Sequence, residues 1–346
     1  MSGQRRGAWG AVARSGLALA ELPYALAVSW RNAKYDRGGD AVRHVGVPVI
    51  SIGNLTVGGT GKTPLVCAVA AWFRQHGVRV AIVSRGYKAD QSTGRNDEAL
   101  ELEQRLPDVP HIQNADRVAG AELAIDELGM QLILLDDGFQ HRRIGRDLDI
   151  VVVDALNPFG YGHLLPRGML REPLSSARRA NLLVMSRANL VAERRRQEIR
   201  QEFLRAAGEI PWVETAQTPR GWLAVGRPLA PLSQLHDQRV VAFCGIGNPD
   251  GFRQSLAGVG VLPVDWQNFP DHHAYSRDDI QQLGQLAQRQ RAAALVCTHK
   301  DLVKINAQQI SGVPVYALQI EVDVLTGHEL WESQLQTILR QVPVDA

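Results

Sequence analysis

The sequence has little of the features that mark several specialised classes of protein. Its 346 residues include only three cysteines, which lie far apart in the chain, each within an apolar run. They form no Cys-x-x-Cys or Cys/His pattern, so we expect buried, reduced thiols and neither a zinc site nor a disulfide framework. Lys and Arg total 38, Asp and Glu total 36, and a net charge of +2 is too small to predict a nucleic-acid partner. A composition of 45% hydrophobic and 21% charged residues is typical of a globular protein.

The chain also lacks an apolar run long enough to cross a membrane. Its N-terminal apolar stretch, residues 15–30, is 16 residues long and contains Glu21 and Pro23. A spanning helix needs about 20 mostly apolar residues. The same two residues count against a cleavable signal peptide, which the preceding arginines would otherwise favour.

The N-terminal segment nevertheless carries the basic excess of the chain. Residues 1–43 hold seven basic and three acidic side chains, a net charge of +4. Basic residues on both sides of an apolar stretch that includes Tyr24 and Trp30 favour a helix lying on an anionic membrane surface. We therefore predict a membrane-interface helix within residues 1–40. A helix packed on its own domain is the alternative, and one helix could do both.

Residues 41–210 have the pattern of an α/β domain. Short runs rich in Val, Ile and Leu predict strands, and stretches with apolar residues every three or four positions predict helices between them. Strands that are apolar throughout indicate a parallel sheet covered on both faces. We expect strands at 48–55, 78–86, 131–137, 148–155 and 181–190, and helices at 64–77, 117–129 and 192–208.

A second succession of strand, glycine turn and helix begins at residue 239. It continues with a helix at 278–290 and strands at 293–301 and 314–322, so we interpret residues 239–346 as a second, smaller α/β lobe with a C-terminal helix. Residues 211–238 contain four prolines and little periodicity. We expect them to connect the two lobes as an irregular segment.

A glycine-rich segment lies between the first predicted strand and the first predicted helix. Glycines let successive main-chain N–H groups turn toward phosphate oxygens, and the following helix adds its positive N-terminal end. The segment ends in GGTGKT and matches the P-loop pattern GxxxxGK[ST] except at its first position, which is Thr rather than Gly. In this setting we predict a P-loop NTPase-like domain, in which Lys62 neutralises the β- and γ-phosphates; a purely structural turn is the alternative. The candidate nucleotide-binding residues are Thr56, Val57, Gly58, Gly59, Thr60, Gly61, Lys62 and Thr63.

Two adjacent aspartates, Asp136 and Asp137, end the strand predicted at 131–137. A carboxylate at a strand end beside a P-loop can hold Mg²⁺, as in a Walker B motif, and the Thr63 hydroxyl would be a second ligand. Neighbouring residues of an extended strand point to opposite sides, so we expect the two aspartates to differ in function. The one that does not face the metal could cap a helix or turn.

Several further motifs occur together with the phosphate loop. They are NLTVGGTGKTP, SRGY (84–87), DDGFQHRR, LREP (170–173), DHH (271–273) and THKD (298–301). In this order they resemble the tetraacyldisaccharide 4'-kinases, the lipid A 4'-kinases of Gram-negative bacteria. The resemblance covers residues 20–325 and implies a P-loop kinase on the cytoplasmic face of the inner membrane. Such a kinase would use ATP and Mg²⁺ to phosphorylate the 4'-hydroxyl of an acylated glucosamine disaccharide 1-phosphate, giving lipid IVA; we expect a monomer.

The same resemblance implies a catalytic base and its partner. The acidic step of the family matches residues 96–99, Asn-Asp-Glu-Ala, although both flanking residues differ from the family pattern. Asp97 is then the base that accepts the hydroxyl proton, and Glu98 supports Asp97 or the metal. His272 of the DHH motif matches the histidine that orients the base. A solvated acidic loop is the alternative for residues 96–99.

Other polar side chains are expected at the same sheet edge, because loops at the carboxyl ends of parallel strands meet there. Gln140 follows the Walker B strand and Arg85 follows the second strand. In LREP, Arg171 offers a two-pronged donor for a sugar phosphate or nucleotide, and Glu172 would restrain it. Each of the four could instead be structural, and the THKD step is given no firm role.

Two other classes of protein use similar loops. A P-loop switch ATPase or GTPase also carries GGxGKT, but the partitioning and metal-insertion switches have a Lys where this chain has Val57. A non-catalytic nucleotide-binding membrane adaptor is disfavoured because Lys62, Thr63, both aspartates and a candidate base are all present. Acceptor-dependent phosphate transfer distinguishes the kinase from both.

Overall fold

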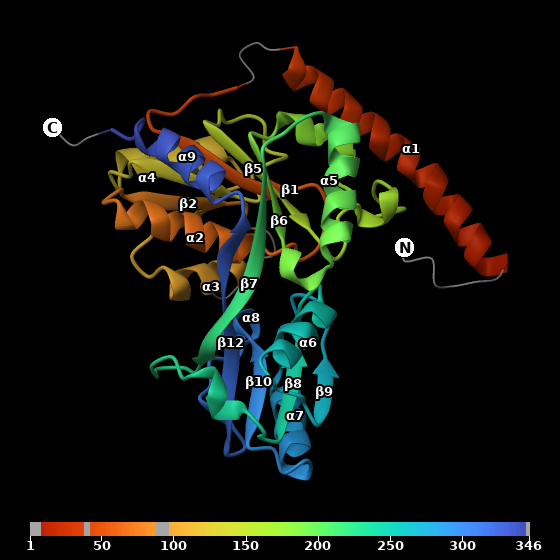
Figure 1. Cartoon of the computed structure of the whole chain (residues 1–346), viewed down its shortest axis with the longest axis vertical. Helices are drawn as coiled ribbons and strands as arrows, with labels where there is room; N and C mark the ends of the chain where they lie inside the picture. The colour runs from red at the N-terminus through yellow and green to blue at the C-terminus, as the bar shows by residue number, and fades with distance from the viewer. Residues whose placement is uncertain (1–7, 38–41, 87–96, 344–346) are drawn as a thin grey trace. The chain divides into compact units, whose positions relative to one another are not determined.

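The computed structural model describes residues 8–37, 42–86 and 97–343, without the side chains of residues 8–14, 97 and 98 (Figure 1). The chain divides into two compact units. Unit 1 comprises Met1–Arg85, Val109–Gln217 and Val322–Ala346, and unit 2 comprises Gly86–Asp108 and Thr218–Glu321.

Two segments lie in a unit other than the one that their position in the chain suggests. Residues 86–108 belong to unit 2, and the C-terminal helix α9 (His328–Leu339) belongs to unit 1. The helix is held there by contacts that the sequence pattern does not reveal. Trp72 Nε1 donates to Glu332 Oε2 at 3.1 Å, and Gln131 Nε2 donates to the carbonyl of Pro343 at 2.9 Å.

Unit 1 is built on a parallel sheet in the strand order β3-β2-β4-β1-β5-β6-β7. Strands β1, β2, β4, β5 and β6 are buried along their whole length, as expected of apolar runs covered on both faces. Because β1 is central, the loop that follows it emerges from the middle of the carboxyl edge. The strands are β1 (Val49–Asn54), β2 (Val80–Ser84), β3 (His111–Gln113), β4 (Leu132–Asp136), β5 (Leu148–Asp154), β6 (Leu182–Ser186) and β7 (Trp212–Leu223).

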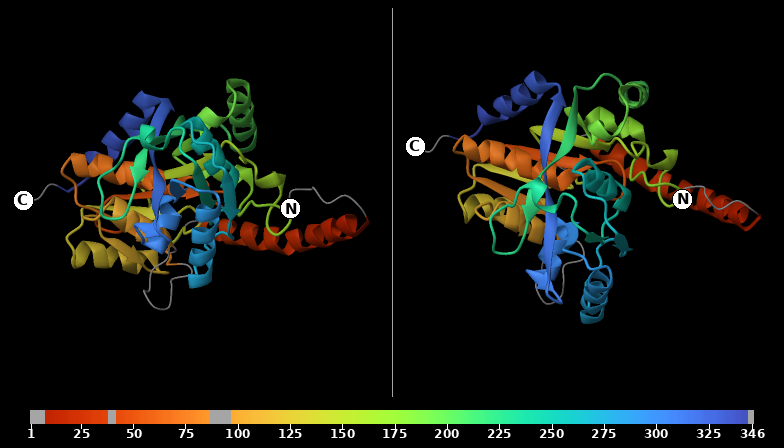
Figure 2. Two further views of the ribbon diagram at one scale, coloured as in Figure 1. Left: turned by 90° about the horizontal axis from the view of Figure 1, so that it is seen from below. Right: turned by 60° about the horizontal axis from the view of Figure 1, so that its bottom comes forward.

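Helices cover both faces of this sheet (Figure 2). The crossover through α2 (Lys62–Gln75) runs from β1 toward the β3 edge, whereas those through α4 (Arg117–Asp126) and α5 (Glu193–Ala207) run the other way. Right-handed crossovers in opposite directions place their helices on opposite faces. The predicted parallel α/β architecture is therefore confirmed.

The N-terminal segment forms one long helix, α1 (Ala8–Asp36), with Pro23 inside it. It is seen in red in Figure 1. Among the described residues, no helix combines the length and the apolar character that crossing a bilayer requires. The sequence prediction of a non-spanning helix agrees with this finding.

Unit 2 has a smaller parallel sheet in the order β12-β10-β8-β9. Its apolar strands bury Val241, Phe243 and Cys297 among helix side chains. The strands are β8 (Val240–Cys244), β9 (Asp265–Asn268), β10 (Ala294–Thr298), β11 (Gln309–Ile310) and β12 (Val313–Thr326). The helices are α3 (Asp97–Arg105), α6 (Pro249–Gly258), α7 (Arg277–Arg289) and α8 (His299–Ile305).

Two local predictions are wrong. The segment expected to be irregular contains the 12-residue strand β7, in which Pro219 and Gly221 hide a strand signal carried by Trp212, Val213 and Thr215. The strand expected at 293–301 ends at Thr298, because the Thr298 side chain accepts a hydrogen bond from the Asp301 N–H and caps α8.

Candidate nucleotide-binding and phosphoryl-transfer site

The segment between β1 and α2 forms a glycine-rich loop at the N-terminus of a helix. Gly58 and Gly61 have φ angles of 104° and 81°, a left-handed backbone that glycine adopts without strain. Lys62 is the first residue of α2, and its Nζ donates to Asn54 Oδ1 at 3.2 Å and lies 3.4 Å from Asp137 Oδ1. The ammonium group is thus held between two strand ends, at the helix terminus that favours an anion.

Asp137 is the centre of a small charged cluster beside this loop. Its Oδ2 accepts a hydrogen bond from Arg171 Nη1 at 2.6 Å, and the same nitrogen lies 3.4 Å from Gln140 Oε1. Burial alone would raise the pKa of Asp137, but Lys62 and Arg171 outweigh it and hold the pKa well below its ordinary value. The carboxylate is therefore ionised. Two predicted site residues, Arg171 and Gln140, lie next to the phosphate loop.

Asp136 occupies a different environment from its neighbour. It is the last residue of β4 and is only 3% exposed, whereas Asp137 has already left the strand with a φ of 54°. A third cation, Arg117 at the start of α4, is buried near both aspartates; burial lowers its pKa and the two carboxylates oppose that shift. Sequence reasoning missed Arg117 because it stands in a run that predicts only a helix.

Residues at the carboxyl ends of β5 and β6 hold the main chain of the phosphate loop in place. Ser186 Oγ donates to the Thr60 carbonyl at 2.7 Å, and Arg187 Nη2 donates to the Gly59 carbonyl at 3.0 Å. Arg187 is itself fixed by Asp154, whose Oδ2 lies 2.7 Å from Nη1. None of these residues is among the predicted site residues. They meet the loop only because the parallel sheet places the ends of β1, β5 and β6 next to one another.

Glu172 has another role than the predicted restraint of Arg171. Its side chain is fully buried, and its oxygens accept hydrogen bonds from Arg31, Asn32 and Arg179 at 2.9–3.0 Å. Arg31 and Asn32 lie on α1, so Glu172 joins the N-terminal helix to the LREP segment. The expectation that Glu172 restrains Arg171 is therefore corrected: the cations it pairs with are Arg31 and Arg179.

Replacing this carboxylate is expected to lower stability strongly. In Glu172→Gln, Arg31 and Arg179 keep their charges next to a neutral amide, and breaking a buried ion pair in this way costs about 3–5 kcal/mol of unfolding free energy. Glu202→Gln is the matched control, since its pair with Arg205 is exposed and worth at most about 1 kcal/mol. Urea unfolding of the two variants measures the difference, and equal losses would contradict the anchoring role.

The other predicted catalytic residues belong to unit 2. Helix α3 begins at Asp97, but the side chains of Asp97 and Glu98 lie outside the part of the chain that the structure describes. His272 follows β9 with a left-handed φ of 61°, and its side chain is 34% exposed. Its neighbour His273 stacks on Phe269, and its Nε2 lies 3.0 Å from Asp279 Oδ2. Arg85, in unit 1, is exposed just after β2.

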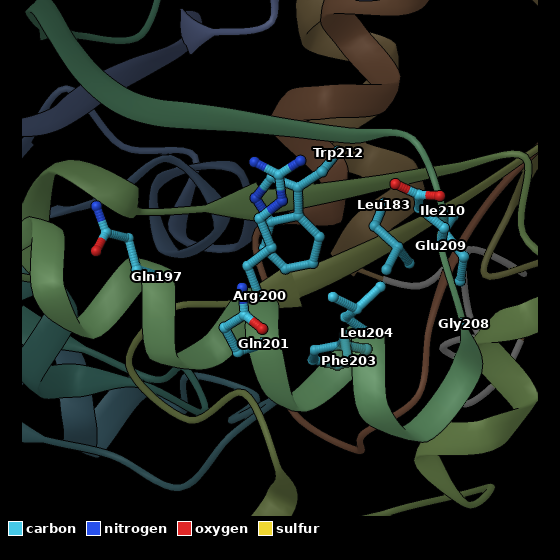
Figure 3. A pocket seen from close by; sticks show the side chains of 10 residues that line it. All are labelled: Leu183, Gln197, Arg200, Gln201, Phe203, Leu204, Gly208, Glu209, Ile210 and Trp212. Atoms are coloured by element: carbon cyan, nitrogen blue, oxygen red, sulfur yellow. The ribbon is translucent and has the colours of Figure 1, made fainter.

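A cavity of 220 Å³ in unit 1 lies elsewhere (Figure 3). It is formed by α5 and by the amino ends of β6 and β7, whereas the phosphate loop follows the carboxyl end of β1. Its lining is mostly apolar or neutral and includes none of the predicted site residues. The lining residues are Leu183, Gln197, Arg200, Gln201, Phe203, Leu204, Gly208, Glu209, Ile210 and Trp212.

A parallel α/β sheet whose central strand leads into a glycine-rich loop, with a lysine at the start of the next helix, defines a P-loop nucleotide-binding protein. The sequence matches the family described as tetraacyldisaccharide-1-P 4'-kinase (LpxK) over residues 13–340. The chain belongs to this family, which confirms the resemblance stated from the motifs.

Individual relatives agree with this assignment. The tetraacyldisaccharide 4'-kinase of Anaeromyxobacter sp. (strain K) is 38% identical, with 98% of this chain and 94% of the relative covered. That of Geobacter sulfurreducens is 35% identical, with 98% and 97% covered. The crystal structure of an "apo" form of LpxK from Aquifex aeolicus in complex with ATP has a TM-score of 0.73 and 28% identity, covering 94% of this chain and 99% of that one.

Proposed function

We propose that this kinase transfers the γ-phosphoryl group of ATP to the 4'-hydroxyl of a tetraacylated glucosamine disaccharide 1-phosphate, giving lipid IVA in lipid A biosynthesis. The observation that carries the proposal is the placement of Lys62 at the N-terminus of α2, beside Asp137 and Arg171. We infer the acceptor from membership of the tetraacyldisaccharide-1-P 4'-kinase family. The Aquifex aeolicus relative was solved with ATP.

On the nucleotide side, the residues present fit a magnesium ion. Thr63 offers a hydroxyl and Asp136 a carboxylate, and hard oxygen donors of this kind are what Mg²⁺ prefers. Asp137 is already paired with two cations, so we assign the metal to Asp136 and Thr63. When held by these two residues, Mg²⁺ would supply positive charge that offsets the negative charge of the phosphates. Lys62 and the loop N–H groups would bind the phosphates, with Arg171, Gln140 and Arg85 at the edge of the site.

On the acceptor side, a group must take the proton of the attacking hydroxyl. We assign this role to Asp97, with His272 as its orienting partner and Glu98 as support. Both Asp97 and His272 belong to unit 2, and α3 begins at Asp97. A hydroxyl that loses its proton to a positioned carboxylate attacks the γ-phosphorus more readily, and such a base contributes about 10²- to 10⁴-fold to turnover.

The test of the proposal is acceptor dependence. Labelled ATP is incubated with mixed micelles that contain the disaccharide 1-phosphate, and label in the lipid is compared with label released as phosphate. If the protein is the proposed kinase, the label found in the lipid far exceeds the label released as phosphate. Hydrolysis at similar speed with and without the acceptor would favour the switch ATPase instead.

Helix α1 is proposed to hold the enzyme at an anionic membrane surface, the cytoplasmic face of the inner membrane. Leu19, Leu22, Leu26 and Trp30 recur at helical spacing and are 60–73% exposed. Their positions place them on one stripe of the helix. Other α1 residues pack against the rest of unit 1, to which the helix belongs: Tyr24 donates to the Arg171 carbonyl at 3.0 Å. One helix can thus serve both as packed element and as membrane contact.

A charge on this stripe is expected to weaken membrane binding. Leu26→Glu replaces a leucine that is 71% exposed, and losing its burial in the interface costs about 1.5–3 kcal/mol, or roughly 10- to 100-fold in vesicle affinity. Leu262→Glu is the control, because Leu262 is 75% exposed in unit 2. Sedimentation with anionic vesicles at low salt measures both, and equal affinities would contradict the membrane role of α1.

A further inference from the structure

The THKD step, which the proposed reaction leaves without a role, forms the start of the short helix α8. His299, Asp301, Leu302 and Val303 are buried there, so a seven-residue helix hides two ionisable side chains. Burying such groups is costly unless their hydrogen bonds are satisfied. The cap of α8 is the Thr298 hydroxyl, so capping does not account for the burial of His299 and Asp301. The contacts of each buried side chain therefore have to explain its burial.

Asp301 holds the loops on one side of α8. Its Oδ1 accepts hydrogen bonds from the Gly245 N–H at 3.1 Å and the Tyr275 hydroxyl at 2.9 Å, and its Oδ2 accepts one from the Thr298 hydroxyl at 2.6 Å. The ring of Tyr275 in turn packs against His273, with centroids 5.1 Å apart. The buried carboxylate thus ties the loop after β8 to the loop that carries His272.

Helix α8 also contacts the main chain of the loop that carries His272. Lys304 Nζ donates to the His273 carbonyl at 3.0 Å, and the His273 N–H donates to the Pro270 carbonyl at 3.1 Å. His272 itself has a left-handed φ of 61°. A residue other than glycine keeps such a strained backbone only where its surroundings fix it. Here these are Lys304 of α8 and the loop's own hydrogen bond from His273 to Pro270.

The other side of α8 packs against α3, the helix that begins at Asp97. His299 Nε2 lies 2.9 Å from Gln104 Oε1. Burial lowers the pKa of His299 to about 4, so the ring is neutral at pH 7 and donates its N–H to the amide oxygen. The same short helix is therefore bonded to the helix of Asp97 and to the loop of His272, all within unit 2.

We propose that the β10–α8 junction, with His299 and Asp301 as positioning residues, fixes the Asp97 helix and the His272 loop in the arrangement that the base and its partner need. The inference rests on the proposed function of Asp97 and His272. Positioning errors near 1 Å can cost about 100-fold in rate, so small changes at α8 are expected to affect turnover. Binding of ATP should not change, because the phosphate loop belongs to unit 1.

Two tyrosines in unit 2 allow a matched test. Tyr275→Phe removes a hydroxyl that bonds Asp301, and Tyr316→Phe removes one that bonds Gln234 at 2.8 Å, away from α8. We expect Tyr275→Phe to lower kcat about 10-fold with an unchanged KM for ATP, and Tyr316→Phe to leave both unchanged. Melting temperatures confirm that the two variants are equally folded. Equal kcat values for the two would overturn the inference.

A double-mutant cycle separates this inference from the proposed function. If Tyr275 acts through His272, the effect of Tyr275→Phe disappears in a His272→Ala background. A full 10-fold effect in both backgrounds would overturn the positioning role while leaving the proposed function intact. Wild-type kcat for His272→Ala alone would instead remove the proposed partner of the base.

A second matched pair of variants tests the contact between α8 and α3. Gln104→Leu removes the acceptor of His299, and Gln234→Leu removes the donor to Tyr316. A loss of kcat in Gln104→Leu but not in Gln234→Leu supports the second connection of α8, and equal values would overturn it.

Discussion

Lys62→Ala is expected to lower turnover at least about 100-fold, because it removes the ammonium group that the structure places at the phosphate loop. A positioned donor to developing charge contributes about 10²- to 10³-fold. In the described part of the chain, Lys62 Nζ lies within 3.4 Å of Asn54 and Asp137 side-chain oxygens. This contact holds the ammonium group at the loop. Steady-state kinetics at saturating lipid acceptor measures the loss.

Two features make this experiment specific. Asp137 keeps its partner Arg171 in the variant, with the 2.6 Å contact unaffected, so the fold around the carboxylate is expected to survive and the melting temperature to change little. Lys62→Arg is the control for charge. A planar guanidinium does not replace a compact ammonium, so it should recover only part of the activity. Turnover of Lys62→Ala within tenfold of wild type would contradict a phosphate-binding role.

Asp97→Asn is expected to produce the second large effect. The amide has the shape of the carboxylate but cannot accept a proton, so a base that contributes about 10²- to 10⁴-fold is lost. The decrease should appear in kcat, with little change in KM for ATP, because the phosphate loop lies in unit 1 and α3 lies in unit 2. Initial rates at saturating ATP and saturating lipid acceptor measure the decrease.

The neighbouring carboxylate provides the comparison for Asp97. Glu98→Gln makes the same chemical change one position along α3 and is expected to reduce turnover less, since Glu98 is assigned a supporting role only. Wild-type turnover in Asp97→Asn would place the base elsewhere. A larger loss in Glu98→Gln than in Asp97→Asn would exchange the two roles.

The sequence predicted those parts of the fold and site that are encoded locally. Strands β1, β2, β4, β5 and β6 are mostly apolar and fully buried, and the phosphate loop is a contiguous motif with glycines at Gly58 and Gly61, where the backbone has positive φ. These signals do not depend on distant residues. Strand β7 was missed because Pro219 and Gly221 weaken the local pattern, and its pairing with β6 is set by tertiary contacts.

Residues that act through distant partners were not predictable in the same way. Arg187 supports the loop only because β6 lies beside β5 and close to the loop after β1. The expectation is that Glu172 restrains Arg171, but two of its three partners, Arg31 and Asn32, lie about 140 residues earlier, on α1, and the third is Arg179. A buried carboxylate in a short motif can serve either purpose, and only the fold decides which cation it meets.

The most direct measurement of the central claim is an equilibrium titration of the purified, folded protein with magnesium ATP. We predict saturable binding below millimolar concentration, weakened by Lys62→Ala and unchanged by Tyr316→Phe. If wild-type protein takes up no magnesium nucleotide at millimolar concentration, or if Lys62→Ala binds it as tightly as wild type, the assignment of residues 56–63 as the phosphate loop of this kinase is contradicted.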